Sequence, residues 1–165
     1  MDVTSKRPYM PGYGIQGPDR GAGLLPWSWA EERLARSRNY WIASRWPDGR
    51  PHSMPVWGVW HESSFWFSSS KGSRKARNLE ADPRCVVTTE DAAQPVVVEG
   101  VAELISAHDQ LATLLELENT KYGTDYGIEM LDPALNSAFR VRPGWAFGLD
   151  ANDFTGSPTR WSLGE

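Results

Sequence analysis

The chain has 165 residues, enough for one domain with a full core. Its formal net charge of −4 argues against a general nucleic-acid-binding surface. No apolar run approaches the roughly 20 residues that span a bilayer, so a membrane span is not expected. The single cysteine, Cys85, excludes an internal disulfide, and its apolar neighbours indicate a buried, unreactive thiol. The three histidines share no metal-ligand spacing with acidic residues, so a zinc site is not expected.

The N-terminal segment is rich in glycine, proline and charge, and it lacks the apolar centre of a signal peptide. We therefore expect residues 1–26 to form a flexible arm and residues 27–165 to form the folded domain of a cytoplasmic protein. The first predicted element of that domain is a helix over Trp27–Arg38, with Ser28 and Glu31 in the spacing of a capping box. Aromatic and β-branched runs separated by turn residues then predict an antiparallel meander of three strands: Asn39–Trp46, His52–Trp60 and Phe65–Ser69.

The second half of the chain alternates helices with further strands. A helix is predicted over Gly72–Ala81, ended by Asp82-Pro83, and a longer one over Ser106–Tyr122, ended by Gly123. Four more strands are predicted: Arg84–Glu90, Pro95–Ile105 with a bulge or bend at Gly100, Ala138–Arg142 and Trp145–Asp150. Six or seven strands, mostly linked by hairpins, predict a mainly β fold with helices, arranged as a small antiparallel barrel.

Hydroxyls and cations gather where the third strand gives way to a helix, over Ser68–Leu79. Serine hydroxyls, arginine, lysine and a helix N-terminus are the groups that hold a bound phosphate. A solvated loop and an exposed helix face would have the same composition. The segment therefore indicates an anion site, with a solvated surface as the alternative.

The order of short motifs adds to this interpretation. The motifs are Asp48-Gly49-Arg50-Pro51-His52, Pro55-Val56-Trp57-Gly58-Val59-Trp60, Gly72-Ser73-Arg74-Lys75-Ala76, Asn78-Leu79, Asp82-Pro83-Arg84 and Val97-Val98-Glu99-Gly100-Val101-Ala102-Glu103. In this order they resemble the pyridoxamine 5′-phosphate oxidase-like family of flavin and deazaflavin oxidoreductases, over about Trp27–Trp161. The resemblance implies a six- to seven-stranded split β-barrel of the FMN-binding type. It also implies a homodimer that binds FMN or the deazaflavin F-420 in a groove at the subunit interface.

Carried over residue by residue, the resemblance implies a cofactor site built from several segments. A strand would run beside the cofactor ring, the end of the next strand and the following helix would hold its phosphate, and the partner subunit would contribute a residue. The implied cofactor-binding residues are Met54, Pro55, Val56, Trp57, Ser68, Ser69, Ser73, Arg74, Lys75, Asn78, Gln94 and Trp161. At Gly58, a bulge and the close approach of a flat ring are both compatible with glycine. At the C-terminal end, Trp161 either closes the cofactor groove or caps the barrel.

Two departures separate the chain from pyridoxamine phosphate oxidases proper. Met54 and Val59 stand where those enzymes carry arginine and lysine, and Thr159-Arg160-Trp161 replaces their C-terminal Arg-x-His signature. The Trp-Gly-Val-Trp strand looks more like the actinobacterial branch that uses F-420. We therefore expect F-420 as the cofactor, with FMN as the alternative.

The implied reaction is transfer of a hydride to a small planar acceptor. No side chain is an obvious general acid, and Tyr122 and Tyr126 are either proton donors or packing residues. Because no acid–base constellation is visible, a second hypothesis remains open. In it, the same barrel is a non-catalytic carrier or sensor of a flavin, a haem or another flat ligand.

Overall fold

The structure, a computed structural model, describes residues 2–164, so the first residue of the predicted arm and the last residue of the predicted domain lie outside it. Its helices are α1 (Trp27–Arg36), α2 (Arg74–Ala81), α3 (His108–Tyr122) and the short 3₁₀ helices η1 (Ile128–Leu131) and η2 (Ala151–Asp153). Its strands are β1 (Val3–Lys6), β2 (Tyr40–Arg45), β3 (Pro51–Val56), β4 (Val59–His61), β5 (Ser64–Ser70), β6 (Arg84–Thr89), β7 (Val96–Ile105), β8 (Asn136–Gly148) and β9 (Thr159–Leu163). Among the described helices, none is both long and apolar enough to cross a membrane.

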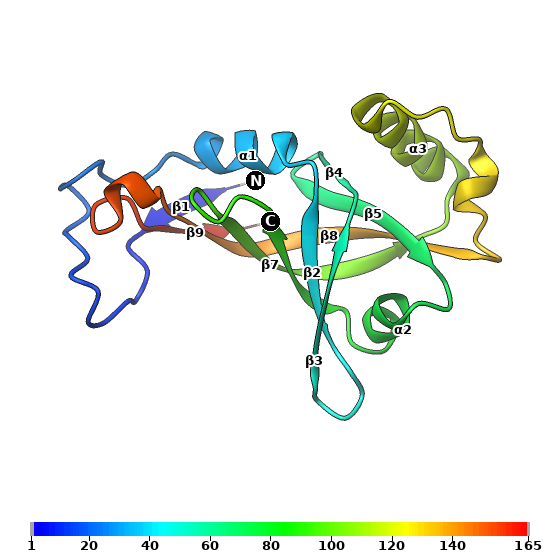
Figure 1. Cartoon of the computed structure of the whole chain (residues 1–165), viewed down its shortest axis with the longest axis horizontal. Coiled ribbons are helices and arrows are strands. Elements are labelled where there is room, and N and C mark those ends of the chain that lie inside the picture. The colour runs from blue at the N-terminus through cyan, green and yellow to red at the C-terminus, as the bar shows by residue number, and fades with distance from the viewer. Residues whose placement is uncertain (1, 165) are drawn as a thin grey trace.

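All the strands belong to one antiparallel sheet with a branch. Its main path runs β1-β9-β8-β7-β6-β2-β3, and β5 also pairs with β8 and carries β4 at its other edge. The branch is possible because β8 is 13 residues long and pairs with β5 along one half and with β9 along the other. In Figure 1, α1 and α3 lie along the upper side of the strands and α2 lies below them. The prediction of a mainly antiparallel β fold with helices is confirmed, and the sheet is compatible with a split barrel.

The last predicted pair of strands is wrong, because β8 continues through Pro143 and Gly144 as one strand. Its register against β7 shifts between Glu99 and Gly100, which face Trp145 and Pro143, so Gly144 of β8 is the extra residue of a bulge. A Cβ at Gly100 would lie 2.4 Å from the Arg142 carbonyl oxygen, so only glycine fits there. The predicted bulge or bend at Gly100 is thereby confirmed.

The N-terminal segment, expected as a flexible or surface-draped arm, is attached to the sheet at its start. Its strand β1 pairs with β9, with Val3 opposite Leu163. The Arg7 guanidinium then donates hydrogen bonds to the carbonyls of Pro158, Gly17 and Arg20, at 2.8, 3.0 and 3.0 Å. These contacts hold the segment against the end of the sheet.

Helix boundaries follow local capping chemistry. The predicted capping box at Ser28 is wrong, because α1 already begins at Trp27, and Pro26 precedes it without a side-chain cap. Ser73 caps α2, since its Oγ accepts a hydrogen bond from the Ala76 N–H at 3.3 Å. Gly123 ends α3 in the left-handed conformation, as predicted.

The interior has two apolar clusters. The larger fills the sheet and includes Tyr40, Phe65 and Phe139; Cys85 is buried there as predicted, and burial raises the pKa of its thiol to about 12. The smaller cluster joins α3 to the strands beneath it and includes Val59, Trp66, Ile105, Leu111, Leu114, Leu131 and Ala138. Because the second cluster anchors α3, that helix stands as a wall over the ends of β3 and β5.

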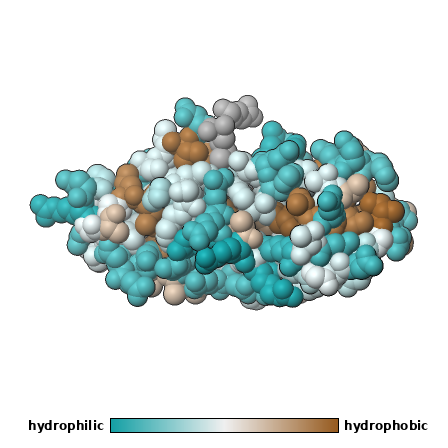
Figure 2. Space-filling model, turned by 90° about the horizontal axis from the view of Figure 1, so that it is seen from above, coloured by the Kyte–Doolittle hydropathy of each residue, from teal (hydrophilic) through white to brown (hydrophobic). Residues whose placement is uncertain are grey.

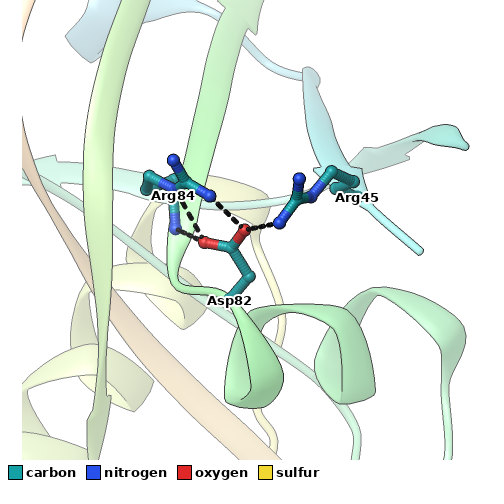
Figure 3. Close-up of polar contacts among 3 residues, drawn as sticks. All are labelled: Arg45, Asp82 and Arg84. Carbon is teal, nitrogen blue, oxygen red and sulfur yellow. Dashed lines mark hydrogen bonds and ion pairs between the residues drawn. The ribbon is translucent and has the colours of Figure 1, made fainter. Parts of the chain in front are cut away.

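An ion-pair group fixes the end of α2. Asp82, which follows the helix, accepts from Arg45 of β2 and Arg84 of β6 at 2.7 Å each (Figure 3). The two guanidinium groups hold the pKa of the Asp82 carboxyl well below its usual range, with the hydrogen bonds from Arg84 as the largest cause. The bridge ties α2 to two strands of the sheet and so fixes the helix whose first turn carries Ser73 and Lys75.

Candidate functional site

A pocket of about 300 Å³ lies where β3 and β5 end, between α2 on one side and α3 with η1 on the other. Half of the twelve predicted residues line it, and they come from three separate segments: Pro55, Val56, Trp57, Ser68, Ser69 and Lys75. The opposite wall is built from α3 and the segment after it: Leu115, Glu118, Asn119, Thr124, Tyr126, Met130 and Leu131. The fold therefore brings the predicted ring strand and the predicted phosphate junction to one cavity.

The junction between β5 and α2 has the groups of an anion site. A hydrogen bond of 2.9 Å joins Ser69 Oγ and Ser73 Oγ, and Ser73 also caps the helix. Lys75 lies in the first turn of α2, lines the pocket and has no ion-pair partner among the described residues. Burial lowers the pKa of its ammonium group. Hydroxyls, an unpaired ammonium and a helix N-terminus together favour a bound phosphate.

Arg74 stands apart from the pocket lining. Its guanidinium lies 3.9 Å from the centre of the Trp46 ring, and Arg50 lies 4.5 Å from the same ring. The cation–π contacts join the start of α2 to the β2–β3 hairpin. The structure therefore places Lys75, and not Arg74, on the pocket wall.

Two predicted contact residues are buried in the interior. Asn78 is fully buried, and its amide donates to Ser44 Oγ at 3.1 Å. Trp161 is also fully buried, and its indole N–H donates to the Leu25 carbonyl at 3.1 Å. Both side chains pack within the chain, so the candidate site leaves them out.

Two others lie outside the pocket on the surface. Gln94 is in the β6–β7 connection, where its carbonyl accepts from Arg33 at 2.6 Å and its amide donates to Asp150 at 3.2 Å. Met54 is 45% exposed on β3 and does not line the pocket. A contact of either residue with a cofactor stays a prediction, for Met54 beside the ring and for Gln94 with the cofactor of the partner subunit.

The Trp57–Gly58 link is clamped from α3. The Tyr122 ring stacks on Trp57 at 4.2 Å between ring centres and 2° between planes. The Tyr122 hydroxyl accepts from the Gly58 N–H at 2.9 Å, while Lys121 Nζ donates to the Gly58 carbonyl at 2.8 Å and to the Tyr40 hydroxyl at 2.7 Å. One face of the Trp57 indole is thereby fixed at the pocket edge.

Glycine at position 58 has a packing reason. A Cβ there would lie 2.3 Å from the Phe65 ring. A flat ligand is therefore not needed to explain the glycine at position 58, because the ring that approaches this backbone is the chain's own Phe65.

Sequence reasoning missed two titratable groups on α3. Burial raises the pKa of the Glu118 carboxyl to about 7 and lowers the pKa of the Lys121 ammonium to about 8. Glu118 follows Leu111, Leu114 and Leu115 on the apolar stripe of the helix, at a position where the period calls for another apolar residue. A glutamate at an apolar position of the helix is the sequence signal that could have revealed Glu118.

The surface beside the pocket is apolar. Figure 2 shows apolar groups gathering toward the end of the molecule that carries α3 and η1. Large exposed apolar side chains of that segment are Tyr126, Ile128, Met130 and Leu135. The approach to the pocket therefore suits a ligand with an apolar face.

A larger groove of about 960 Å³ contains none of the predicted residues. It runs along β2, β6, β7 and β8, and several of its charged groups are paired within the chain. Asp82 binds Arg45 and Arg84, and Arg142 binds Glu103 at 2.5 Å. Because these charges already have partners, the smaller pocket is the better candidate for an anionic ligand.

Comparison with known proteins assigns the family. Residues 29–149 match the sequence model of the pyridoxamine 5′-phosphate oxidase family. The chain belongs to this family. No curated protein matches the sequence closely enough to add a function to the family assignment.

Solved structures of the pyridoxamine 5′-phosphate oxidase type share the fold. A conserved hypothetical protein, Rv2991 from Mycobacterium tuberculosis, is 24% identical with a TM-score of 0.68, over 78% of this chain and 87% of its own. A protein described as an F420 reductase is 27% identical with a TM-score of 0.57, over 68% of this chain and 91% of its own. HutZ, a haem storage protein from Vibrio cholerae, is 21% identical with a TM-score of 0.59, over 73% and 90%.

Proposed function

We propose that this protein is an oxidoreductase that binds a deazaflavin of the F-420 type, with FMN as the alternative cofactor, in the pocket between β3, β5, α2 and α3. The observation that carries the proposal is the convergence of six implied cofactor residues from three segments on one cavity. Likeness to a protein described as an F420 reductase favours F-420 over FMN. The absence of the two basic residues at Met54 and Val59 distinguishes the proposed activity from pyridoxamine phosphate oxidation.

The residues of the pocket fit the two ends of such a cofactor. Ser69 of β5 and Lys75 of α2 line the pocket and offer a hydrogen bond and a positive charge to the phosphate, and Ser73, hydrogen-bonded to Ser69, caps α2 beside them. At the other end, β3 is the edge of the sheet path, so its outer row of backbone N–H and C=O groups is open to the ring. The clamped Trp57 supplies a flat apolar wall there.

The bound cofactor would supply a hydride, and the chain would position it and exclude water. Leu115, Met130 and Leu131 give the far wall an apolar surface. Such a wall favours a small planar acceptor lying parallel to the cofactor ring. In a dry cavity the charge of Lys75 acts more strongly than in water.

A homodimer is part of the same proposal. Trp41 on β2 and Val101 on β7 are 47% and 42% exposed, and large apolar groups on a sheet face indicate contact with another surface. A second copy packed there would cover the exposed sheet. In that arrangement Gln94 would reach the cofactor of the partner subunit.

The experiment that tests the proposed function is turnover with defined acceptors. Purified protein, reduced F-420 or reduced FMN, and a panel of quinones, enones and tetrapyrroles are mixed without oxygen, and cofactor oxidation is followed by absorbance. We expect acceptor-dependent oxidation that Lys75→Met strongly reduces at limiting cofactor concentration. Tight binding without turnover for any acceptor would instead support the non-catalytic carrier.

A further inference from the structure

Reduction of a double bond by hydride needs a proton as well as a hydride. This inference rests on the proposed function and concerns the source of that proton. Of the two tyrosines considered from the sequence, Tyr122 is buried, and its hydroxyl accepts from the Gly58 N–H and donates to the Arg38 carbonyl at 2.8 Å. Its proton is therefore directed to the Arg38 carbonyl and not to the pocket.

Glu118 is the one acidic side chain among the described residues that line the pocket. It faces Lys75 of α2 and the serines of β5 across the cavity, with Leu115 on its own helix and Leu131 of η1 beside it. No described side chain hydrogen-bonds to its carboxyl. The carboxyl is thus held by packing at the cavity and is free to meet a ligand there.

The surroundings of Glu118 keep a large fraction of its carboxyl protonated near neutral pH. The apolar neighbours disfavour the carboxylate, and burial raises the pKa to about 7. Lys121, one turn further along α3, offsets part of this effect, while its own ammonium is bound to the Tyr40 hydroxyl and the Gly58 carbonyl. Lys75 and Tyr126 are the other titratable groups that line the cavity. An acid that titrates near the working pH is the most effective proton donor.

We propose that Glu118 is the catalytic residue that donates the proton completing reduction of the acceptor. A hydride brings two electrons and one hydrogen to one carbon of the acceptor's double bond, and the π bond breaks. The electron pair left on the neighbouring atom takes the proton of the Glu118 carboxyl. The carboxylate then regains a proton from solvent, so the acceptor gains two electrons and two hydrogens while the reduced deazaflavin or flavin is oxidised by two electrons.

The first test measures protons and not activity. A negatively charged cofactor bound beside Glu118 makes the carboxylate less favourable, so binding above pH 7 takes up protons at this side chain. Calorimetric titration with F-420 at pH 8, in buffers of different ionisation enthalpy, counts the protons. We expect Glu118→Gln to lose a substantial fraction of one proton from the wild-type uptake, and Glu116→Gln, at an exposed position of the same helix, to lose none. Equal uptake by Glu118→Gln and wild type would overturn the proposal.

The second test is kinetic. Glu118→Gln should lower kcat by on the order of 10²- to 10⁴-fold, with little change in the cofactor Kd below pH 7, and Glu118→Asp should recover part of the rate. The wild-type rate should fall above pH 7, and the Gln variant should lose this dependence.

These outcomes separate the inference from the proposed function. If F-420 and FMN both fail to bind the wild-type protein, the proposed function and the role of Glu118 fall together. If wild type turns over and Glu118→Gln is equally active, only the role of Glu118 is contradicted.

Discussion

Glu118 and Lys121 lie one turn apart on α3, and burial moves the pKa of each toward neutrality. For Glu118 the folded pKa of about 7 is above the ordinary value of 4.5, so between these values the folded state binds more protons than the unfolded state. Stability from this group is therefore fully present below pH 4.5 and is lost as the pH rises through about 7. A carboxyl that destabilises the fold at neutral pH is typical of a functional site and not of a packing position.

We expect Glu118→Gln to flatten this pH dependence. Between pH 5 and pH 8, the free energy of unfolding of the wild type should fall by about 1–3 kcal/mol more than that of the variant. The reason is that the uncharged amide of the variant does not titrate. Urea denaturation at the two pH values measures the difference. The same change of stability with pH in both proteins would show that the carboxyl is not buried as described.

At the phosphate end, Lys75 and Arg74 are neighbouring cations, so substitutions at the two positions serve as test and control. Lys75→Met should weaken cofactor binding by about 1.5–3 kcal/mol, because it removes a charge-assisted contact at the pocket. Arg74→Met should cost clearly less affinity, since the guanidinium is stacked on Trp46 outside the lining. Dissociation constants for F-420, measured at one salt concentration, compare the two variants. A larger loss of affinity for Arg74→Met than for Lys75→Met would show that the phosphate does not bind in the pocket.

At the scale of elements, α2 is positioned by its cap and by the ion pairs at its end. Ser73→Ala should lower the free energy of unfolding by about 1 kcal/mol, because the Ala76 N–H loses its acceptor. Ser28→Ala is the control, since Ser28 lies inside α1 and makes no cap. Thermal or urea unfolding of the two variants measures the difference, and equal effects would contradict the assigned cap.

The sequence predicted these elements where local chemistry decides them. The apolar stripe and Gly123 located α3, and turn residues located the β2–β3 hairpin. The predicted meander of three strands is wrong, because the strand predicted over His52–Trp60 is divided into β3 and β4, and β5 pairs with β4 and β8 and not with β3. It failed where distant pairing decides. β1 exists through its partner β9, and β8 continues through Pro143 because this residue stays paired with Gly100 of β7. Capping at Ser28 failed because the N-cap position is two residues earlier, at Pro26, and Ser28 lies inside the helix.

At the scale of the whole molecule, the site depends on how α3 returns to the strands. Motif order located the β3, β5 and α2 side of the pocket, since those segments are close in sequence. The other wall, with Glu118 and Tyr126, is placed by a separate apolar cluster that no local pattern reveals. For the same reason Asn78 and Trp161, polar or aromatic in sequence, proved to be interior residues only in the folded chain.

The exposed sheet face predicts the assembly. We expect Trp41→Glu to convert a homodimer to monomers, because a charge would be buried at the contact, while Trp41→Phe should remain dimeric. Light scattering after size-exclusion chromatography measures the mass. A wild-type monomer, or a Trp41→Glu variant that stays dimeric, would contradict the use of this face.

The central claim is that the pocket beside Trp57 binds a flavin-type cofactor. The most direct measurement is a titration of the protein with F-420 and with FMN, followed by quenching of tryptophan fluorescence and by the absorbance spectrum of the bound cofactor. We predict saturable binding of F-420 at micromolar or lower concentration, weakened by Lys75→Met. Failure of both cofactors to bind at micromolar concentration would contradict the account.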